Sequence, residues 1–305
     1  MKTKLVIILG PTAVGKSELA MELAALLSGE IVSADSQQVY RYLDIGTGKP
    51  SPEDQQRISH HLIDVLDPDE PFNVALFRTV AAQCIEQVHR RDRPILVCGG
   101  TGLYIKALTQ GLFEGPAHDP AIRRVLQQRI EQEGLAALYE QLVEIDPNVK
   151  STIDANDRQR TIRALEVYQL TGRPLSQWQK DHAFQQQPYD VLKIGLNRER
   201  GELYERINRR CEQMIQDGLL DEVRGLVAMG FGLGLKPLCS VGYRQMGQVL
   251  SGVQELPEGI EEMKQETRKL AKRQLTWFRA DREICWFEPQ SKDAIVKKVG
   301  DFLAK

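Results

Sequence analysis

The sequence predicts an α/β fold in which a parallel sheet is flanked by helices and carries an all-helical insertion. Three observations support this fold class. Short apolar runs at residues 5–9, 30–34 and 94–98 alternate with segments of helical periodicity, as in sheets built from strand-helix-strand units. The first run ends in a glycine-rich loop. The pattern is wholly helical between residues 116 and 187, and residues 191–196 then return to strand character.

The glycine-rich loop, residues 10–17, reads Gly-Pro-Thr-Ala-Val-Gly-Lys-Ser and fits the pattern G-x-x-x-x-G-K-[ST]. It follows a buried strand and precedes an amphipathic helix with Leu19, Leu23, Leu26 and Leu27 on its apolar side. In that context the loop amides and the helix N-terminus bind an anion, which makes the core P-loop NTPase-like. The expected diphosphate-binding residues are Gly10, Pro11, Thr12, Ala13, Val14, Gly15, Lys16 and Ser17.

The last two residues of this loop have separate expected roles. Lys16 reaches the outer phosphate as a point charge, and the Ser17 hydroxyl helps to hold Mg²⁺. The alternative interpretation is an ordinary glycine turn. Because such a loop binds phosphates and not the group they carry, it does not identify the phosphate compound.

The helical insertion has recognisable signals at both ends. Asp119 is expected to cap the first helix, with Pro120 at its first position, and the sequence Gly-Arg-Pro at 172–174 stops the last long helix. We therefore predict an α/β core domain with the C-terminal helices, residues 1–115 and 188–305, and a helical insertion domain, residues 116–187.

The composition of the 305-residue chain excludes several classes of protein. A net charge of -2 gives no global signal for nucleic acid, so such a partner has to be inferred from local clusters. No apolar run approaches the length needed to span a bilayer, and the N-terminus enters a core strand directly, which predicts a cytoplasmic protein. The five cysteines form no C-x-x-C pair, which argues against a disulfide framework or zinc site and predicts reduced thiols.

Asp35 and Thr101 are the candidate catalytic residues at the sheet edge. Asp35 follows the strand-like residues 30–34, and Thr101 follows residues 94–98 after two glycines. Ligands of open α/β sheets bind outside the carboxyl ends of the strands, so both residues are expected to share a crevice with Gly10. The alternative role of Asp35 is to cap the next turn.

The residues after the strand at 94–98 argue against nucleotide hydrolysis. ATPases and GTPases usually place a magnesium-holding aspartate after such a strand, whereas residues 99–101 are Gly-Gly-Thr. The glycines instead allow a ligand to approach the backbone closely, and the threonine offers it a hydroxyl group.

Smaller questions concern the segments between these motifs. Lys49, in a loop rich in glycine and proline, is either solvated or a second phosphate contact, and spacing does not separate the two. Residues 60–65 are expected to form a strand with His60 and His61 on opposite faces, so the two histidines are structural or hydrogen-bonding and do not bind one metal together. Residues 72–90 have the apolar spacing of a packing helix.

Basic residues cluster in three predicted helices. The first helix, residues 158–170, carries arginines near its start. The second, residues 203–229, is rich in arginine and is broken at Gly218. The third, residues 264–282, carries seven basic residues interleaved with Trp277 and Phe278. Such a face suits a phosphate backbone, with the aromatic rings available for stacking, and the alternative is a solvated surface. The arginines of the first two helices are Arg158, Arg160, Arg163, Arg206, Arg209 and Arg210.

Taken together, these segments resemble the tRNA dimethylallyltransferase family, also called tRNA isopentenyltransferases, over most of the chain. Arg244 stands where many members have lysine, which keeps the charge, and the zinc-binding C-terminal extension of eukaryotic relatives is missing, so a bacterial form is expected. The resemblance is carried by residues 10–17, 35–40, 45–50, 60–64, 99–104, 156–167, 171–174, 241–243 and 267–277.

The resemblance implies transfer of a dimethylallyl group from dimethylallyl diphosphate to the exocyclic N6 amine of adenosine at tRNA position 37, next to the anticodon. Diphosphate is released, and Mg²⁺ is the implied cofactor. Lys16 and Arg210 then stabilise the charge of the leaving diphosphate, Asp35 accepts the amine proton, and Thr101 lies on the opposite side. The expected partners are the tRNA anticodon stem-loop and dimethylallyl diphosphate, with no membrane and no obligate protein partner, for a monomer.

The same resemblance assigns tRNA contacts to four segments and two single residues. The single residues are Thr101 and Arg123. The segments are Asp35, Ser36, Gln37 and Gln38; Gln159, Arg160, Thr161, Ile162 and Arg163; Ser240, Val241, Gly242, Tyr243, Arg244 and Gln245; and Lys272, Arg273, Gln274, Leu275, Thr276, Trp277, Phe278 and Arg279.

Three other functions fit parts of the sequence. An isopentenyltransferase acting on free adenine nucleotides shares the phosphate loop and the base, but it has no need of the helical insertion or the basic C-terminal helix. A small-molecule kinase with ATP in the loop explains neither residues 99–101 nor residues 272–279. A non-catalytic RNA-binding protein leaves the phosphate loop without a purpose.

Overall fold

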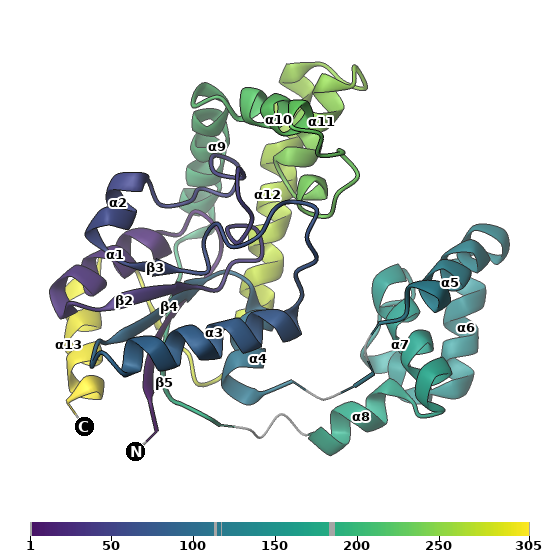
Figure 1. Ribbon diagram of the computed structural model, residues 1–305, viewed down its shortest axis with the longest axis horizontal. Coiled ribbons are helices and arrows are strands. Elements are labelled where there is room, and N and C mark those ends of the chain that lie inside the picture. Colours follow the sequence, from purple (N-terminus) through teal and green to yellow (C-terminus); the bar gives the residue numbers. More distant parts are fainter. Residues whose placement is uncertain (1, 113–114, 117, 183–186, 305) are drawn as a thin grey trace. The chain divides into compact units, whose positions relative to one another are not determined.

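The computed structural model describes residues 2–112, 115–116, 118–182 and 187–304 (Figure 1). The chain divides into two compact units. The first, which we call the core unit, joins Met1–Thr109 to Gln187–Lys305, and the second, the helical unit, is Gln110–Gln186. The structure confirms the α/β fold class predicted from the sequence, with helices covering a parallel sheet.

The sheet of the core unit contains six strands among the described residues, in the order β3-β2-β4-β1-β5-β6. Neighbouring strands are parallel, with Ile7 opposite Val97 and Ile194 opposite Ile8. The carboxyl ends of β2, β4 and β1 therefore meet at one edge. The strands are β1 (Lys4–Leu9), β2 (Glu30–Ser33), β3 (His60–His61), β4 (Ile95–Gly99), β5 (Asp190–Leu196) and β6 (Cys285–Phe287).

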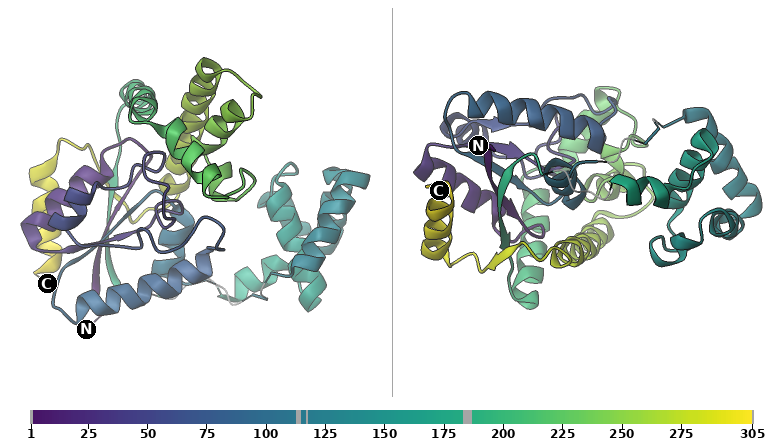
Figure 2. Two further views of the ribbon diagram at one scale, coloured as in Figure 1. Left: turned by 45° about the horizontal axis from the view of Figure 1, so that its top comes forward. Right: turned by 90° about the horizontal axis from the view of Figure 1, so that it is seen from below.

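Helices cover both faces of this sheet. Figure 2 shows α3 on one face and α1 with α13 on the other, and the Lys292 ammonium of α13 pairs with Glu22 of α1. The helices of the core unit are α1 (Lys16–Leu27), α2 (Pro52–Arg57), α3 (Val74–His89), α4 (Gly102–Gln110), α9 (Arg200–Gln216), α10 (Leu219–Ala228), α11 (Tyr243–Leu250), α12 (Leu256–Arg279) and α13 (Lys292–Leu303), with a short 3-10 turn at Pro237–Cys239.

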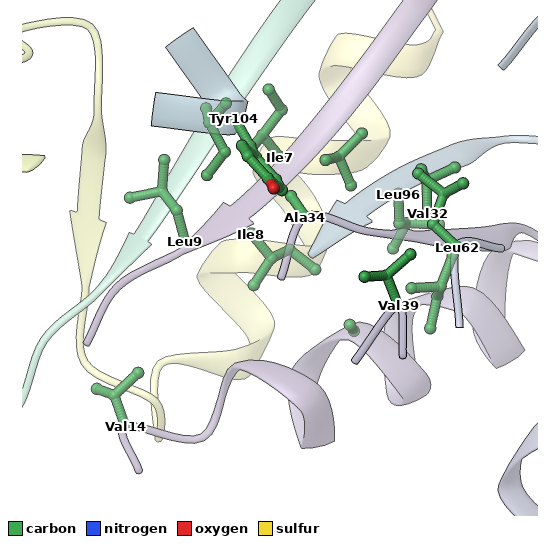
Figure 3. Close-up of a cluster of buried hydrophobic side chains, with 14 of the residues drawn as sticks. Ile7, Ile8, Leu9, Val14, Val32, Ala34, Val39, Leu62, Leu96 and Tyr104 are labelled. Atoms are coloured by element: carbon green, nitrogen blue, oxygen red, sulfur yellow. The ribbon is translucent and has the colours of Figure 1, made fainter. Parts of the chain in front are cut away.

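The two covered faces explain why the strands are apolar along their whole length. Ile7, Ile8 and Leu96 are completely buried, and Figure 3 shows Ile7 beside Tyr104 and Leu96 beside Val32. The Tyr104 ring stacks on Phe77 of α3 with 4.2 Å between ring centroids. This core reaches directly beneath the sheet edge where the phosphate loop begins.

The helical unit has its own apolar core. Asp119 caps its first helix by accepting hydrogen bonds from Ala121 N and Ile122 N, and Gly172 ends α7 in a left-handed conformation, as predicted. Leu126, Leu142 and Leu165 are buried together between the helices. The helices are α5 (Pro120–Glu133), α6 (Leu135–Ile145), α7 (Arg158–Thr171) and α8 (Leu175–His182), with a 3-10 turn at Pro147–Ser151.

The structure corrects two sequence expectations. The strand predicted at 60–65 is limited to His60–His61, because Leu62 and Asp64 have φ values of 65° and 55°, which interrupt an extended backbone. Leu26, expected on the apolar side of α1, is 62% exposed, and the small residues Ala20 and Ala24 face the core instead.

Other expectations agree with the structure. His60 Nδ1 lies 2.8 Å from the Ile58 carbonyl oxygen and His61 Nε2 lies 2.7 Å from a Glu30 carboxylate oxygen, so both histidines have structural partners. Gly218 separates α9 from α10 in a left-handed conformation. All five cysteines are free thiols. Within the described ranges, no helix has both the length and the apolar character required to cross a membrane.

Candidate active site

The phosphate loop lies at the carboxyl end of β1 and leads into α1. Its backbone turns through positive φ at Gly10, Ala13 and Gly15, and a Cβ atom at Gly10 would lie 2.6 Å from the Leu196 carbonyl oxygen. Val14 is completely buried and anchors the loop to the core below it (Figure 3). Thr12 N donates to Gln274 Oε1 at 2.8 Å, so the other loop amides and the N-terminus of α1 are the groups available to an anion.

Cations surround the loop, and they are held by backbone carbonyl groups. Lys16 Nζ donates to the Pro11 oxygen at 2.7 Å, Arg206 Nε to the Ala13 oxygen at 3.0 Å, and Arg198 Nε to the Val14 oxygen at 3.0 Å. Arg210 Nη2 lies 3.4 Å from the Thr47 oxygen. A cavity of about 890 Å³ opens between the loop and α9, and its lining includes Lys16, Ser17, Arg206, Arg209 and Arg210.

Burial changes the protonation of these cations. Burial, together with the charge of Arg210, lowers the pKa of Lys16 to about 8, although Cys98 and Asp35 act in the opposite direction. Burial also lowers the pKa of Arg210, against the attraction of Asp35. Two half-buried cations next to each other are stabilised by a polyanion, so the pocket favours a ligand of high negative charge.

Asp35 and Thr101 lie where the sequence predicts, beyond the ends of β2 and β4. Asp35 Oδ1 accepts hydrogen bonds from Gln37 N at 2.8 Å and Gln38 N at 3.4 Å, so one carboxylate oxygen does cap the following turn. Asp35 Oδ2 has no hydrogen bond among the described residues. Thr101 Oγ1 accepts from Ser36 N at 3.2 Å, which joins the segment after β4 to the segment after β2. The hydroxyl proton of Thr101 remains free to be donated.

Lys49 is neither a solvated side chain nor a second phosphate contact, the two alternatives that the sequence left open. Its side chain is 4% exposed, and its ammonium group donates to Asp44 Oδ1, Asp64 Oδ1 and the Tyr40 carbonyl oxygen. Three acceptors use all three ammonium protons, so Lys49 fixes its own loop beside the cavity. The same loop accepts a hydrogen bond at the Gly48 oxygen from Gln38 Nε2 at 3.2 Å.

Glu222 of α10 is a structural residue of the site that the sequence did not indicate. Its carboxylate accepts hydrogen bonds from the backbone amides of Asp44, Ile45 and Gly46, and from the Tyr243 hydroxyl group. Glu222 therefore holds the loop that carries the carbonyl groups facing Arg210 and Gln38. No spacing rule could identify it, because three of its four partners are backbone amides almost 180 residues away.

The structure divides the expected tRNA contacts into exposed and buried side chains. Lys272, Arg273, Thr276, Trp277 and Arg279 form an exposed face of α12, which we call the basic face, and Gln159 and Arg160 are exposed on α7. The side chains of Thr161, Ile162, Tyr243, Gln245 and Phe278 are buried instead, so they do not form a contact surface.

Two of these buried side chains, Tyr243 and Gln245, have hydrogen-bond partners inside the protein. Tyr243 donates to Glu222, and Gln245 Oε1 accepts from Gly242 N at the start of α11. Helical spacing could have indicated the burial of Ile162, because it shares an apolar stripe with Leu165. At the neighbouring positions, Arg244 pairs with Glu262 at 3.0 Å, and the remaining residues of the segment, Ser240 and Val241, are half-buried.

Arg123 and Arg163 of the helical unit converge on Glu166, which is completely buried. Arg123 donates to both carboxylate oxygens at 2.8 and 3.0 Å, and Arg163 Nη1 donates at 2.7 Å. Burial raises the pKa of Glu166, but the hydrogen bonds from the two arginines outweigh it and lower the pKa overall. Arg158 and Arg160 pair with separate acids, Glu131 and Asp157, so the predicted arginine cluster is not one continuous patch.

Comparisons with known proteins agree with the geometry. The family model described as IPP transferase matches residues 38–281, and the model described as isopentenyl transferase matches residues 3–67. The chain belongs to the IPP transferase family. It is 52% identical over 302 residues to "tRNA dimethylallyltransferase 2" of Syntrophus aciditrophicus (strain SB), covering 99% of this chain and 97% of that relative.

Solved members of the IPP transferase family have the same fold. The full-length tRNA isopentenylpyrophosphate transferase of Bacillus halodurans is 39% identical, with a TM-score of 0.74 and coverage of 99% of this chain and 97% of that one. A eukaryotic dimethylallyltransferase acting on tRNA is 27% identical, with a TM-score of 0.80 and coverage of 99% and 80%. The family resemblance found in the sequence is confirmed.

The donor groups at the phosphate loop fit a magnesium ion held mainly by a diphosphate. No group of three or more His, Cys, Asp or Glu side chains converges to hold a metal in the described part of the chain. The Ser17 hydroxyl oxygen, which lines the cavity, is a ligand of the kind that Mg²⁺ accepts. Mg²⁺ commonly keeps several waters and binds substrate phosphates, so a single protein hydroxyl group is sufficient here.

The lowered pKa of Lys16 predicts how diphosphate binding depends on pH. Above pH 8 the free protein loses the Lys16 proton, so affinity for magnesium pyrophosphate falls by about tenfold per pH unit. Lys16→Arg keeps its charge throughout this range and therefore lacks this loss. Isothermal titration calorimetry from pH 7 to pH 10 measures the affinity of both proteins. Because pyrophosphate ionises in the same way in both titrations, the difference between the two pH profiles reports on residue 16. Parallel profiles would contradict the prediction.

Proposed function

We propose that this chain transfers a dimethylallyl group from dimethylallyl diphosphate to the N6 amine of adenosine at position 37 of tRNA, with release of diphosphate. The observation that carries the proposal is the sheet edge itself. It brings a phosphate loop with two half-buried cations, Lys16 and Arg210, next to a carboxylate with one oxygen that has no partner among the described residues. The relatives named above as tRNA dimethylallyltransferases support the choice of donor and acceptor.

The donor half of the site stabilises the leaving group. Breaking the allylic carbon-oxygen bond places negative charge on diphosphate, and the loop amides, Lys16 and Arg210 stabilise that charge as it develops. A magnesium ion at Ser17 would supply further positive charge to the diphosphate. Since the cations are fixed by backbone carbonyl groups, they need little reorganisation during the reaction.

The acceptor half of the site activates a weak nucleophile. The lone pair of the adenine amine is delocalised into the ring, so the amine gains from a base that takes its proton during attack. Asp35 Oδ2 fills this role, while Oδ1 stays fixed by the Gln37 and Gln38 amides. Thr101, whose hydroxyl oxygen accepts from Ser36 N, forms a hydrogen bond near the bridging oxygen or the amine.

The RNA is bound by exposed basic residues. The basic face of α12 offers Lys272, Arg273 and Arg279 to phosphates and Trp277 to a base, and Gln159 and Arg160 offer further contacts in the helical unit. The target base has to leave its stack in the anticodon loop to reach the sheet edge. We also propose that the protein is a monomer and is located in the cytoplasm.

The decisive experiment supplies radioactive dimethylallyl diphosphate and Mg²⁺, without ATP, to an anticodon stem-loop with adenosine at position 37 and to AMP in the same reaction. Label on the stem-loop alone is the expected result. Label on AMP would replace the proposal with a free-nucleotide isopentenyltransferase. Label on neither, with ATP turnover on small-molecule acceptors, would replace it with a kinase.

Replacing Asp35 by asparagine tests the assignment of the base. Asparagine keeps an oxygen for the Gln37 amide but does not accept a proton, so kcat should fall by about 10²–10⁴-fold. The dissociation constant of the stem-loop should change little. Asp67→Asn, at an exposed carboxylate paired with Arg41, is the matched control. An Asp35→Asn enzyme with more than half of the wild-type kcat would remove Asp35 as the base.

Reversing two charges on the basic face tests the RNA surface. Lys272→Glu with Arg273→Glu should weaken stem-loop binding by about tenfold or more and make its salt dependence less steep by about 1.5 in the log-log slope. Lys297→Glu with Lys298→Glu, exposed on α13, changes the net charge equally and should have a much smaller effect. Equal effects of the two pairs would show that the basic face is only a solvated surface.

A further inference from the structure

Gln274 of α12 makes two hydrogen bonds that join separate parts of the site. Its Oε1 atom accepts from Thr12 N of the phosphate loop at 2.8 Å, and its Nε2 atom donates to the Gly100 carbonyl oxygen at 3.0 Å. Thr12 lies within the phosphate loop, residues 10–17, and Gly100 directly precedes Thr101. One carboxamide group therefore bridges the donor loop and the turn that carries the candidate catalytic hydroxyl group.

The glycines on both sides of Thr101 are fitted to α12. A Cβ atom at Gly100 would lie 2.4 Å from Gln274 Nε2, and a Cβ atom at Gly102 would lie 2.2 Å from Trp277 Cδ1. Neither side chain could remain in place beside an alanine at these positions. The segment Gly100–Gly102 is thus positioned by two side chains that lie one helical turn apart on α12.

The polarity of the Gln274 carboxamide matches its partners at both ends. It presents an acceptor to an amide and a donor to a carbonyl group, and no residue other than glutamine offers both at this length. The neighbouring Lys272 and Arg273 are exposed, whereas Gln274 is half-buried and faces the loop. Its hydrogen bonds are therefore directed into the protein and away from the basic face.

We infer that Gln274 is a positioning residue that sets the phosphate loop against the Thr101 turn, and that it is not a direct contact to the RNA. The inference rests on the proposed function only in naming the donor as dimethylallyl diphosphate. The geometry predicts that the loss of the carboxamide loosens the phosphate loop and the Thr101 turn together. Gln274 then acts on the donor site, although it belongs to the segment that carries the basic face.

The test substitutes Gln274→Met, which keeps the length of the side chain and removes both hydrogen bonds. The dissociation constant of magnesium pyrophosphate for the protein without RNA should rise by about tenfold, the size expected for two neutral hydrogen bonds. The KM for dimethylallyl diphosphate at saturating stem-loop should rise by a similar factor. Stem-loop binding without the donor should stay within about twofold of wild type.

Two further variants keep the test sharp. Gln265→Met makes the same substitution at an exposed position of α12 and should leave both dissociation constants unchanged. Gln274→Glu keeps the acceptor for Thr12 N but loses the donor to Gly100 and adds a negative charge, so it should weaken pyrophosphate binding at least as much as Gln274→Met. Thermal unfolding of each variant verifies that it is folded.

The opposite pattern would overturn the inference. If Gln274→Met weakens stem-loop binding and leaves both pyrophosphate affinity and the KM for the donor unchanged, Gln274 is an RNA contact. Failure of the proposed function is distinguishable from this result, because it appears in the wild-type protein as absence of transfer to the stem-loop. Pyrophosphate binding by the free protein reports on Gln274 in either case.

Discussion

The parallel alignment of β2, β4 and β1 is the constraint on which the site depends. Because the three strands are neighbours and run in one direction, their carboxyl ends bring Asp35, Thr101 and the phosphate loop to one edge. A hydrogen bond from Ser36 N to Thr101 Oγ1 then links Thr101 to the residue that follows Asp35. The chemistry thus combines residues from segments that are far apart in the sequence, and only the sheet register brings them together.

Most of the supporting interactions at this edge pair a side chain with the backbone. Glu222 holds three amides, Lys49 takes a carbonyl group together with two carboxylates, and Gln274 bridges an amide and a carbonyl group. Each of these side chains fixes a loop at least in part through backbone atoms, which do not depend on the residue type of the loop. The loops around the cavity are consequently held by side chains from α10 and α12 as well as by their own sequence.

Local signals account for what the sequence could predict. The phosphate loop, the Asp119 cap and the break at Gly218 depend on residues that are neighbours in the chain, and all three are present in the structure. The edge positions of Asp35 and Thr101 followed from strand order in open sheets. Arg210 was predicted from an arginine-rich helix, and it lies close enough to Lys16 for its charge to lower the pKa of Lys16.

Long-range partners account for what the sequence could not predict. Glu222 and Gln274 act on backbone groups more than 170 residues away, so no local pattern distinguishes them from solvated side chains. The strand predicted at 60–65 was too long because nothing in the residue types of Leu62 and Asp64 indicates their positive φ values. Family segments also included buried members such as Tyr243, because a segment does not distinguish inward from outward side chains.

The carbonyl groups that hold the cations have a consequence for the protein without its ligand. Lys16, Arg206 and Arg210 donate to neutral oxygens, and Asp35 is the carboxylate that offsets part of the positive charge of Lys16 and Arg210. A folded state that contains mutual repulsion between cations gains free energy from any polyanion that enters the cavity, and an unfolded chain does not. The melting temperature of this protein is therefore itself a sensor of its donor site, and sulfate or phosphate in a storage buffer acts as a stabiliser of the fold.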